Sequence, residues 1–253
     1  MKKIFSVLIL CILVGCTSEN RYHIDEITNP TDTLGYLKYD MSLLNGVVYN
    51  DFGEVGVFVN GKRNGFHRQW YKNGQLRYEW RYSNNNCTGY RRWYKNGQID
   101  QEENYKNDKY DGIQKVWYEN GLLKFEMNYV DGMMDGVQKK WYENGQLEHK
   151  EYFKKDQKNG LSTDWRENGL KLRERNYDHD ELNGISRIWF PNGQIQYQGN
   201  YQDGKLIKSQ VWDEDGYRLG TMSFSDIHYM DFDGYRKWKR NTYTSDQLER
   251  LRD

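Results

Sequence analysis

Few residues of this chain have the types and the spacing that a catalytic or metal site requires. The five histidines are scattered along the sequence at His23, His67, His149, His179 and His228. None of them forms a short ligand pair with another histidine or a cysteine, so we predict no zinc site. The sequence also lacks the motifs of serine hydrolases, phosphate-binding loops and dinucleotide-binding turns.

The acidic residues offer weak candidates for chemistry. The segment from Asp178 to Gly184 resembles a calcium-binding loop, but its third ligand is displaced by one position and Trp189 stands where the closing glutamate belongs. We interpret it as an acidic turn. Other carboxylates recur at equivalent places, as Glu119, Glu143 and Glu167 do, whereas an active site needs an asymmetric group of residues in a pocket. We therefore predict no catalytic residues, no metal and no cofactor.

A repeat organises most of the chain. Tryptophans recur every 23 or 24 residues, and they are Trp70, Trp93, Trp117, Trp141, Trp165, Trp189 and Trp212. The motif around them reads Trp-Tyr-Glu-Asn-Gly-Gln-Leu at residues 141–147, with close copies beginning at Trp70, Trp93 and Trp117. A fixed period in this range is typical of repeat architectures.

Each repeat is expected to form one β-hairpin with two turns. The first turn is predicted at the Asn-Gly pairs as a type I′ turn, and its glycines are Gly74, Gly97, Gly121, Gly145, Gly169 and Gly193. The second turn is predicted at pairs such as Asp111-Gly112, Asp135-Gly136 and Asn159-Gly160. Two strands of about six to eight residues remain between the turns.

The strands alternate with period two, which assigns their side chains to faces. We predict that the tryptophans form the packed core between repeats, and that residues such as Leu123, Phe125, Met127 and Tyr129 share one face and fill the gaps. The aromatic residues after the tryptophans then point to the other side. This row is the candidate binding face, because Arg166 replaces an aromatic there without breaking the period, and it comprises Tyr71, Tyr94, Tyr118, Tyr142 and Phe190.

At these motifs the chain resembles the bacterial variant of the MORN-repeat family, most closely the YwqK-type antitoxin proteins. The resemblance extends from about Gly46 to about Gly216. It implies an all-β, elongated antiparallel meander of about seven to eight hairpin units. It also implies roles in protein contact, membrane association or, for the YwqK type, neutralisation of a toxin.

The first residues predict a targeting signal. Lys2 and Lys3 precede an apolar run that is too short to cross a membrane and is typical of a signal peptide. Leu13-Val14-Gly15-Cys16 then resembles the cleavage site of bacterial lipoproteins, which implies that Cys16 carries lipid. The alternative is an ordinary secretory signal that is cut elsewhere.

We accordingly divide the chain into four parts. Residues 1–15 are a signal peptide, 16–34 a polar tether, 35–220 the repeats, and 221–253 a C-terminal cap with a short helix suggested by Thr244-Ser245-Asp246-Gln247. Cys87 remains as a single thiol in the mature repeats.

Composition limits the function classes. Removing Lys2 and Lys3 leaves 37 − 2 = 35 basic against 37 acidic residues, and no basic stripe for nucleic acid is present. We predict a non-catalytic, lipid-anchored binding scaffold of the bacterial envelope with a protein partner. The membrane leaflet and the oligomeric state stay open. Two alternatives are an antitoxin or immunity protein that caps a toxin, and a scaffold that binds envelope glycans through its aromatic rows.

Overall fold

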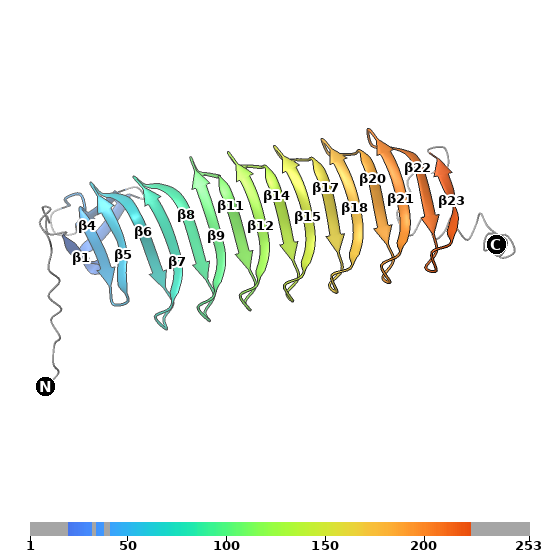
Figure 1. The fold of residues 1–253 in the computed structure, drawn as a ribbon. Helices are drawn as coiled ribbons and strands as arrows, with labels where there is room; N and C mark the ends of the chain where they lie inside the picture. Colours follow the sequence, from blue (N-terminus) through green and yellow to red (C-terminus); the bar gives the residue numbers. More distant parts are fainter. Residues whose placement is uncertain (1–19, 32–33, 38–40, 224–253) are drawn as a thin grey trace, which may run out of the picture. The chain divides into compact units, whose positions relative to one another are not determined.

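The computed structural model describes residues 20–31, 34–37 and 41–223 of the chain. Its contacts group into two compact units, Met1–Asn86 and Cys87–Asp253. In both units most described residues lie in strands of an antiparallel meander (Figure 1). The predicted all-β hairpin-repeat fold is therefore confirmed.

Unit 1 (Met1–Asn86) joins an end structure to the first repeat. Strand β1 (Arg21–His23) pairs in parallel with β4 (Gly46–Asn50), which continues antiparallel into β5 (Gly53–Val59), β6 (Lys62–Trp70) and β7 (Leu76–Ser83). A 3-10 turn (Ile24–Glu26) leads to the hairpin of β2 (Ile27–Thr31) and β3 (Leu34–Leu37). A small core of Leu37, Leu44, Val48 and Phe58 closes this end.

The predicted polar tether is wrong for residues 21–31 and for Leu34. These residues form β1, the 3-10 turn, β2 and the start of β3. The backbone of Arg21–His23 pairs with Val47–Tyr49, while Tyr22 and Ile27 pack against the small core. Such short elements leave no sustained hydrophobic period in the sequence, so they were not detectable by pattern. The predicted signal peptide with Cys16, and the predicted terminal helix, lie outside the described residues.

Unit 2 (Cys87–Asp253) is a meander with a regular pattern of long and very short strands. Each repeat has a strand of six residues that enters the Asn-Gly turn and one of eight that leaves it, then a two-residue strand. The strands are β8 (Asn86–Trp93), β9 (Ile99–Lys106), β10 (Lys109–Tyr110), β11 (Gly112–Trp117), β12 (Leu123–Val130), β13 (Met133–Met134), β14 (Gly136–Trp141), β15 (Leu147–Lys154), β16 (Gln157–Lys158), β17 (Gly160–Trp165), β18 (Lys171–Asp178), β19 (Glu181–Leu182), β20 (Gly184–Trp189), β21 (Ile195–Gln202), β22 (Lys205–Trp212) and β23 (Arg218–Ser223). The longer β8 and β22 depart from this pattern near the two ends of the described part of the unit.

The Asn-Gly turns are not of type I′. In the turn after β14, the amide of Gly145 donates to the carbonyl of Tyr142 at 3.0 Å, and the amide of Tyr142 donates to Gln146 at 2.8 Å. Only the glycine has positive φ, at +85°. This is a three-residue loop in which a type I turn is followed by a left-handed glycine. The asparagine avoids positive φ because its side-chain oxygen accepts from the backbone of Gln146 instead.

The type I′ turns lie at the other end of the hairpins, three or four residues before the predicted Asp-Gly and Asn-Gly pairs. Both central residues have positive φ in Asn107-Asp108, Lys155-Asp156 and His179-Asp180. The predicted positions Gly112, Gly136 and Gly160 instead mark the break between a two-residue strand and the next long strand. The sequence signal was misleading because these three turns contain no glycine, although Asp131-Gly132 and Asp203-Gly204 have positive φ at equivalent positions.

A bulge separates the residues that we expected on one face. Trp117 pairs with Leu123, whereas the preceding Val116 pairs with Phe125, so Lys124 is skipped. The leucine therefore joins the tryptophan face, while Phe125, Met127 and Tyr129 share the opposite face with Gln114 and Val116. The prediction that all four residues form a single row is wrong for this reason.

Hydrogen bonds with the period of the repeat tie each Asn-Gly turn to the next one. The hydroxyls of Tyr94, Tyr118 and Tyr142 donate to the carbonyls of Trp117, Trp141 and Trp165 at 2.7–2.8 Å. Beside them, the amide nitrogens of Asn96, Asn120 and Asn144 donate to the carbonyls of Glu119, Glu143 and Glu167 at 2.9–3.0 Å. The asparagine thus closes its own turn with its oxygen and holds the next turn with its nitrogen.

Removing one of these hydroxyls should weaken the stacking of repeats. We expect Tyr118→Phe to lower the free energy of unfolding by about 1 kcal/mol, because the Trp141 carbonyl loses its donor. Urea denaturation followed by tryptophan fluorescence measures this change. Tyr177→Phe is the matched control, since the Tyr177 ring packs beneath Lys158 and Arg175 and its hydroxyl makes no hydrogen bond with a described residue. Equal losses in both variants would contradict the assignment.

Candidate functional site

The face that carries the tryptophans is the more exposed face of the sheet in unit 2. We call it the indole face. None of the seven repeat tryptophans is among the buried core residues of the described chain; all are half-buried. The prediction that they form the packed core is therefore corrected. Most buried side chains of the repeats lie on the opposite face, where Gln114, Gln138, Ser162 and Ser186 are at most 7% exposed; Thr163, at 4%, is a buried residue of the indole face.

Three parallel rows cross the indole face. At the type I′ end lies the aliphatic row, which we define as Ile113, Val137, Leu161 and Ile185; three of its members are 38–42% exposed and Val137 is half-buried. A central row of charged and polar residues follows, and the tryptophans form the third row. Period two places all three on one side, because strands β11, β14, β17 and β20 run without a skipped residue.

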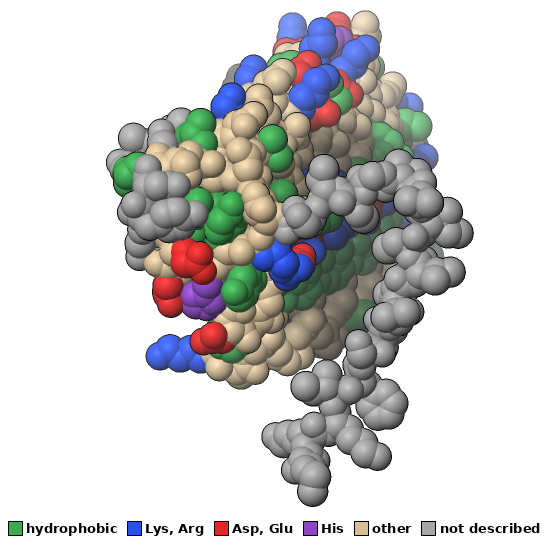
Figure 2. Space-filling model, turned by 90° about the vertical axis from the view of Figure 1, so that its left-hand side faces the viewer, with side chains coloured by type: hydrophobic (Ala, Val, Ile, Leu, Met, Phe, Trp, Pro, Cys, Tyr) green, Lys and Arg blue, Asp and Glu red, His purple; other side chains and the backbone are tan. Residues whose placement is uncertain are grey.

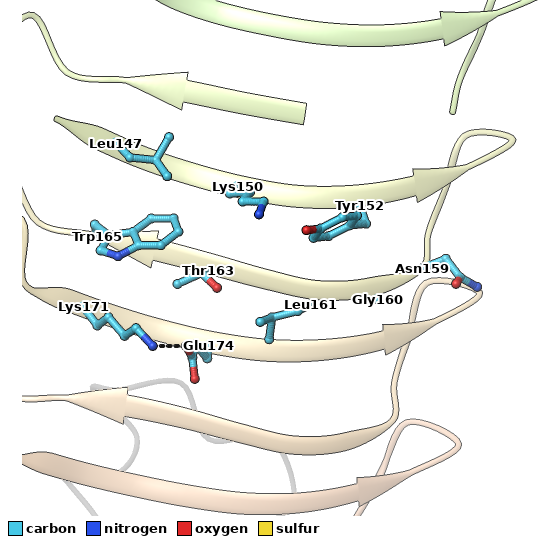
Figure 3. A pocket seen from close by; sticks show the side chains of 10 residues that line it. All are labelled: Leu147, Lys150, Tyr152, Asn159, Gly160, Leu161, Thr163, Trp165, Lys171 and Glu174. Atoms are coloured by element: carbon cyan, nitrogen blue, oxygen red, sulfur yellow. Dashed lines mark hydrogen bonds and ion pairs between the residues drawn. The ribbon is translucent and has the colours of Figure 1, made fainter. Parts of the chain in front are cut away.

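The indole face is hollowed over strands β15, β17 and β18 (Figure 3). This open hollow has a volume of about 540 Å³. Trp165 and Leu147 line it at the Asn-Gly end, Tyr152 and Leu161 line it at the other, and the buried Thr163 lies between them. It combines aromatic and aliphatic surface with a few polar groups, which is typical of ligand sites.

The charges around the hollow are unbalanced. Glu174 makes an ion pair with Lys171 across the hollow's edge and approaches Arg187 at 3.8 Å. Lys150 also lines the hollow, but its ammonium lies 5.1 Å from the centre of the Tyr152 ring and makes no ion pair with a described residue. Three cations therefore face one carboxylate here, although on the side of the molecule in Figure 2 blue and red side chains are interspersed.

An ion cluster lies behind the hollow, on the opposite face of the same strands. His149 contacts Asp164 at 2.5 Å and Glu151 at 3.2 Å, and Arg173 donates to Asp164 at 2.8 Å. Lys158 pairs with Glu151 at 3.0 Å. Hydrogen bonds to Asp164 and Glu151 raise the pKa of His149 to about 9. Burial alone would raise the pKa of Asp164, but its bonds to His149 and Arg173 outweigh that effect and lower it to about 2.

A contrasting histidine lies in unit 1. His67 is buried between the rings of Phe58 and Tyr82, and its Nε2 lies 2.9 Å from the carbonyl of Val57. Burial lowers its pKa to about 4, only partly offset by that backbone contact. A side chain on Gly56 would collide with this ring, since a Cβ there would be 2.3 Å from Nδ1.

The predicted tyrosine row has a structural role. Tyr94, Tyr118 and Tyr142 use their hydroxyls to hold the following repeat, and Arg166 donates to the carbonyl of Trp189 at 3.0 Å from the equivalent position. Arginine can replace tyrosine at position 166 because it donates the equivalent hydrogen bond, and not because the position is exposed. Use of the tyrosines by a partner stays a prediction.

Sequence reasoning missed the residues of the hollow other than Trp165. The alternation that grouped Leu161 and Thr163 with Trp165 was visible, but Lys150, Lys171 and Glu174 come from the strands that follow the turns. The face of the sheet on which these three side chains lie depends on the bulge, which the sequence did not reveal. The calcium-like segment is a tight turn, in which Asp180 accepts from the backbone amide of Lys158.

Comparison with known protein families supports the repeat assignment. The family model described as MORN repeat variant matches residues 63–84, 90–107, 110–131, 134–155 and 182–203. Five segments of the chain therefore match this repeat variant. No curated protein matches the chain. Residues 156–181 lie between two matched segments, and they contain most of the hollow and of the ion cluster.

In the part of the chain that the structure describes, no three His, Cys, Asp or Glu side chains are grouped as metal ligands. Within the same residues, no helix is long and apolar enough to span a bilayer.

The two histidines predict opposite pH dependences of stability. The raised pKa of His149 contributes stability that is complete below pH 6.5 and is lost as pH rises through about 9. The lowered pKa of Asp164 contributes stability that is complete above pH 3.8 and is lost as pH falls toward 2. The cluster therefore stabilises the fold most between pH 3.8 and 6.5. The lowered pKa of His67 contributes stability that is complete above pH 6.5 and is lost as pH falls through about 4.

Denaturant unfolding of the full chain between pH 4 and 10 tests these signs. We expect His149→Gln to flatten the loss of stability above pH 7, and His67→Gln to flatten the loss below pH 6. Each variant serves as the control for the other. A wild-type chain whose stability does not change from pH 7 to pH 10 would contradict the role of His149.

Proposed function

We propose that this chain is a non-catalytic, envelope-anchored scaffold that binds a protein partner through the aliphatic row of its indole face. Repeats of the matched type generally serve as scaffolds for contacts with proteins and membranes. The aliphatic row supports a protein contact, because exposed apolar residues in a continuous strip often mark an interaction surface.

The observation that carries the proposal is the regular exposure of this row. A sheet could cover its aliphatic residues with a second layer, yet Ile113, Leu161 and Ile185 stay about two-fifths exposed. Equivalent residues of neighbouring repeats lie two strands apart, or about 9.5 Å. A partner that spans several repeats can therefore contact the row at evenly spaced points.

Anchoring at the envelope is supported by the sequence of the first residues. The apolar run and Leu13-Val14-Gly15-Cys16 resemble a lipoprotein signal, and they precede the first described strand by only a few residues. A lipid at Cys16 would keep unit 1 near a membrane surface. A single acyl chain binds membranes weakly, so several chains on Cys16 are needed for stable anchoring.

Polar substitution in the aliphatic row should weaken capture of the partner. We expect Ile113→Ser with Ile185→Ser to reduce recovery of a cross-linked envelope protein at least several-fold, while the free energy of unfolding changes by about 0.5 kcal/mol or less per site. Leu122→Ser with Leu170→Ser is the control, because these leucines are equally exposed, at 43% and 39%, but lie in the Asn-Gly turns. Equal recovery with both double variants would contradict the proposed surface.

The anchor has its own test. We expect Cys16→Ser to release the chain from the membrane fraction and to abolish incorporation of labelled fatty acid. Mass spectrometry of the mature amino terminus provides the second measurement. A wild-type chain that begins after another residue, or whose Cys16 carries no lipid, would favour the ordinary secretory signal.

A further inference from the structure

We propose that the hollow around Trp165 binds a linear acidic glycan, a chain of sugars that carry carboxylates. This inference goes beyond the protein-binding role of the aliphatic row. It concerns one repeat, residues 156–181 with the preceding strand β15, which departs from the repeats that match the family model on either side.

The first argument is the shape of the lining. The Trp165 ring stands at one end of the hollow and the Tyr152 ring at the other (Figure 3). Aromatic rings present a negative face, against which the polarised C–H groups of a pyranose can pack. Thr163 lies between the rings, and the Lys171–Glu174 pair lies on the neighbouring strand β18 at the edge of the hollow, so donors and acceptors for sugar hydroxyls are at hand (Figure 3).

The second argument is charge. Glu174 is already engaged by Lys171 and lies 3.8 Å from Arg187, whereas Lys150 has no carboxylate partner among the described residues. The hollow therefore retains excess positive charge. A ligand carboxylate would pair with Lys150 through a charge-assisted hydrogen bond, so the chemistry favours an acidic sugar over a neutral one.

The third argument is the polar row that crosses this face. Lys115 and Lys139 lie in that row beside Glu126, between the aliphatic row and the tryptophans. Cores of protein interfaces are depleted in lysine and glutamate. A polar polymer tolerates such a row. The tryptophans recur at about 9.5 Å, two strands apart, so a chain bound at Trp165 can continue over neighbouring repeats.

The test is titration of the full chain with trigalacturonate, a short probe that covers about one repeat. Isothermal calorimetry and tryptophan fluorescence should both report binding, and a neutral β-1,4-linked glucose trimer should bind at least about tenfold more weakly, as expected for a lost charge-assisted bond. Lys150→Gln and Trp165→Phe should each weaken trigalacturonate binding at least about threefold; Phe keeps an apolar ring in place if deletion of the indole would unfold the repeat.

Lys124→Gln is the matched control. The Lys124 ammonium also lies 5.1 Å from a tyrosine ring, that of Tyr118, but it does not line the hollow. We expect this variant, and the Ile113→Ser, Ile185→Ser double variant, to bind the probe as wild type does. Loss of trigalacturonate binding in this double variant would contradict a site confined to the hollow, because neither isoleucine lines it.

Several results would overturn the inference. They are absence of binding to trigalacturonate, equal binding of the neutral trimer, equal binding of triglutamate, and equal weakening by Lys124→Gln and Lys150→Gln. Triglutamate binding would identify an acidic peptide as the occupant. None of these outcomes bears on the capture of a protein partner, which the aliphatic-row variants test separately.

Discussion

The hydrogen bond from each Asn-Gly turn to the next is the interaction on which the repeat region depends. In unit 2 a one-layer sheet has little enclosed core, so neighbouring hairpins must be aligned by specific contacts. The asparagine amide reaches the next turn, and the tyrosine hydroxyl reaches the next tryptophan carbonyl, as for Asn120 and Tyr118. These bonds explain why the motif repeats so closely around the turn and varies more along the strands.

This alignment leaves the middle of each strand free to vary. Where the turns set the spacing, residues on the indole face can change without loss of register. Arg166 shows how far the turn itself can change, since its guanidinium replaces a tyrosine hydroxyl at the same carbonyl. The repeat with Arg166 is also the one with the hollow and the ion cluster, so a regular scaffold carries one irregular site.

The two faces of the sheet have different physical roles. The opposite face buries small and amide side chains, such as Ser162 and Gln138, and places ion pairs where they rigidify the sheet. Gln138, for example, bonds both the amide and the carbonyl of Asn128 and so replaces missing strand pairing. The indole face keeps aromatic and aliphatic groups half in water, where they are available to a ligand at modest cost in stability.

The sequence alone determined the repeat, its period, its all-β class and the glycines of the Asn-Gly turns, because turn chemistry and alternation are local properties. Only the tertiary structure decided which face is buried and which residues form the hollow. A single skipped residue, such as Lys124, moves every side chain after it to the other face, and that shift depends on pairing between strands. Likewise, the role of Tyr118 depends on a carbonyl in the next repeat, 23 residues away along the chain.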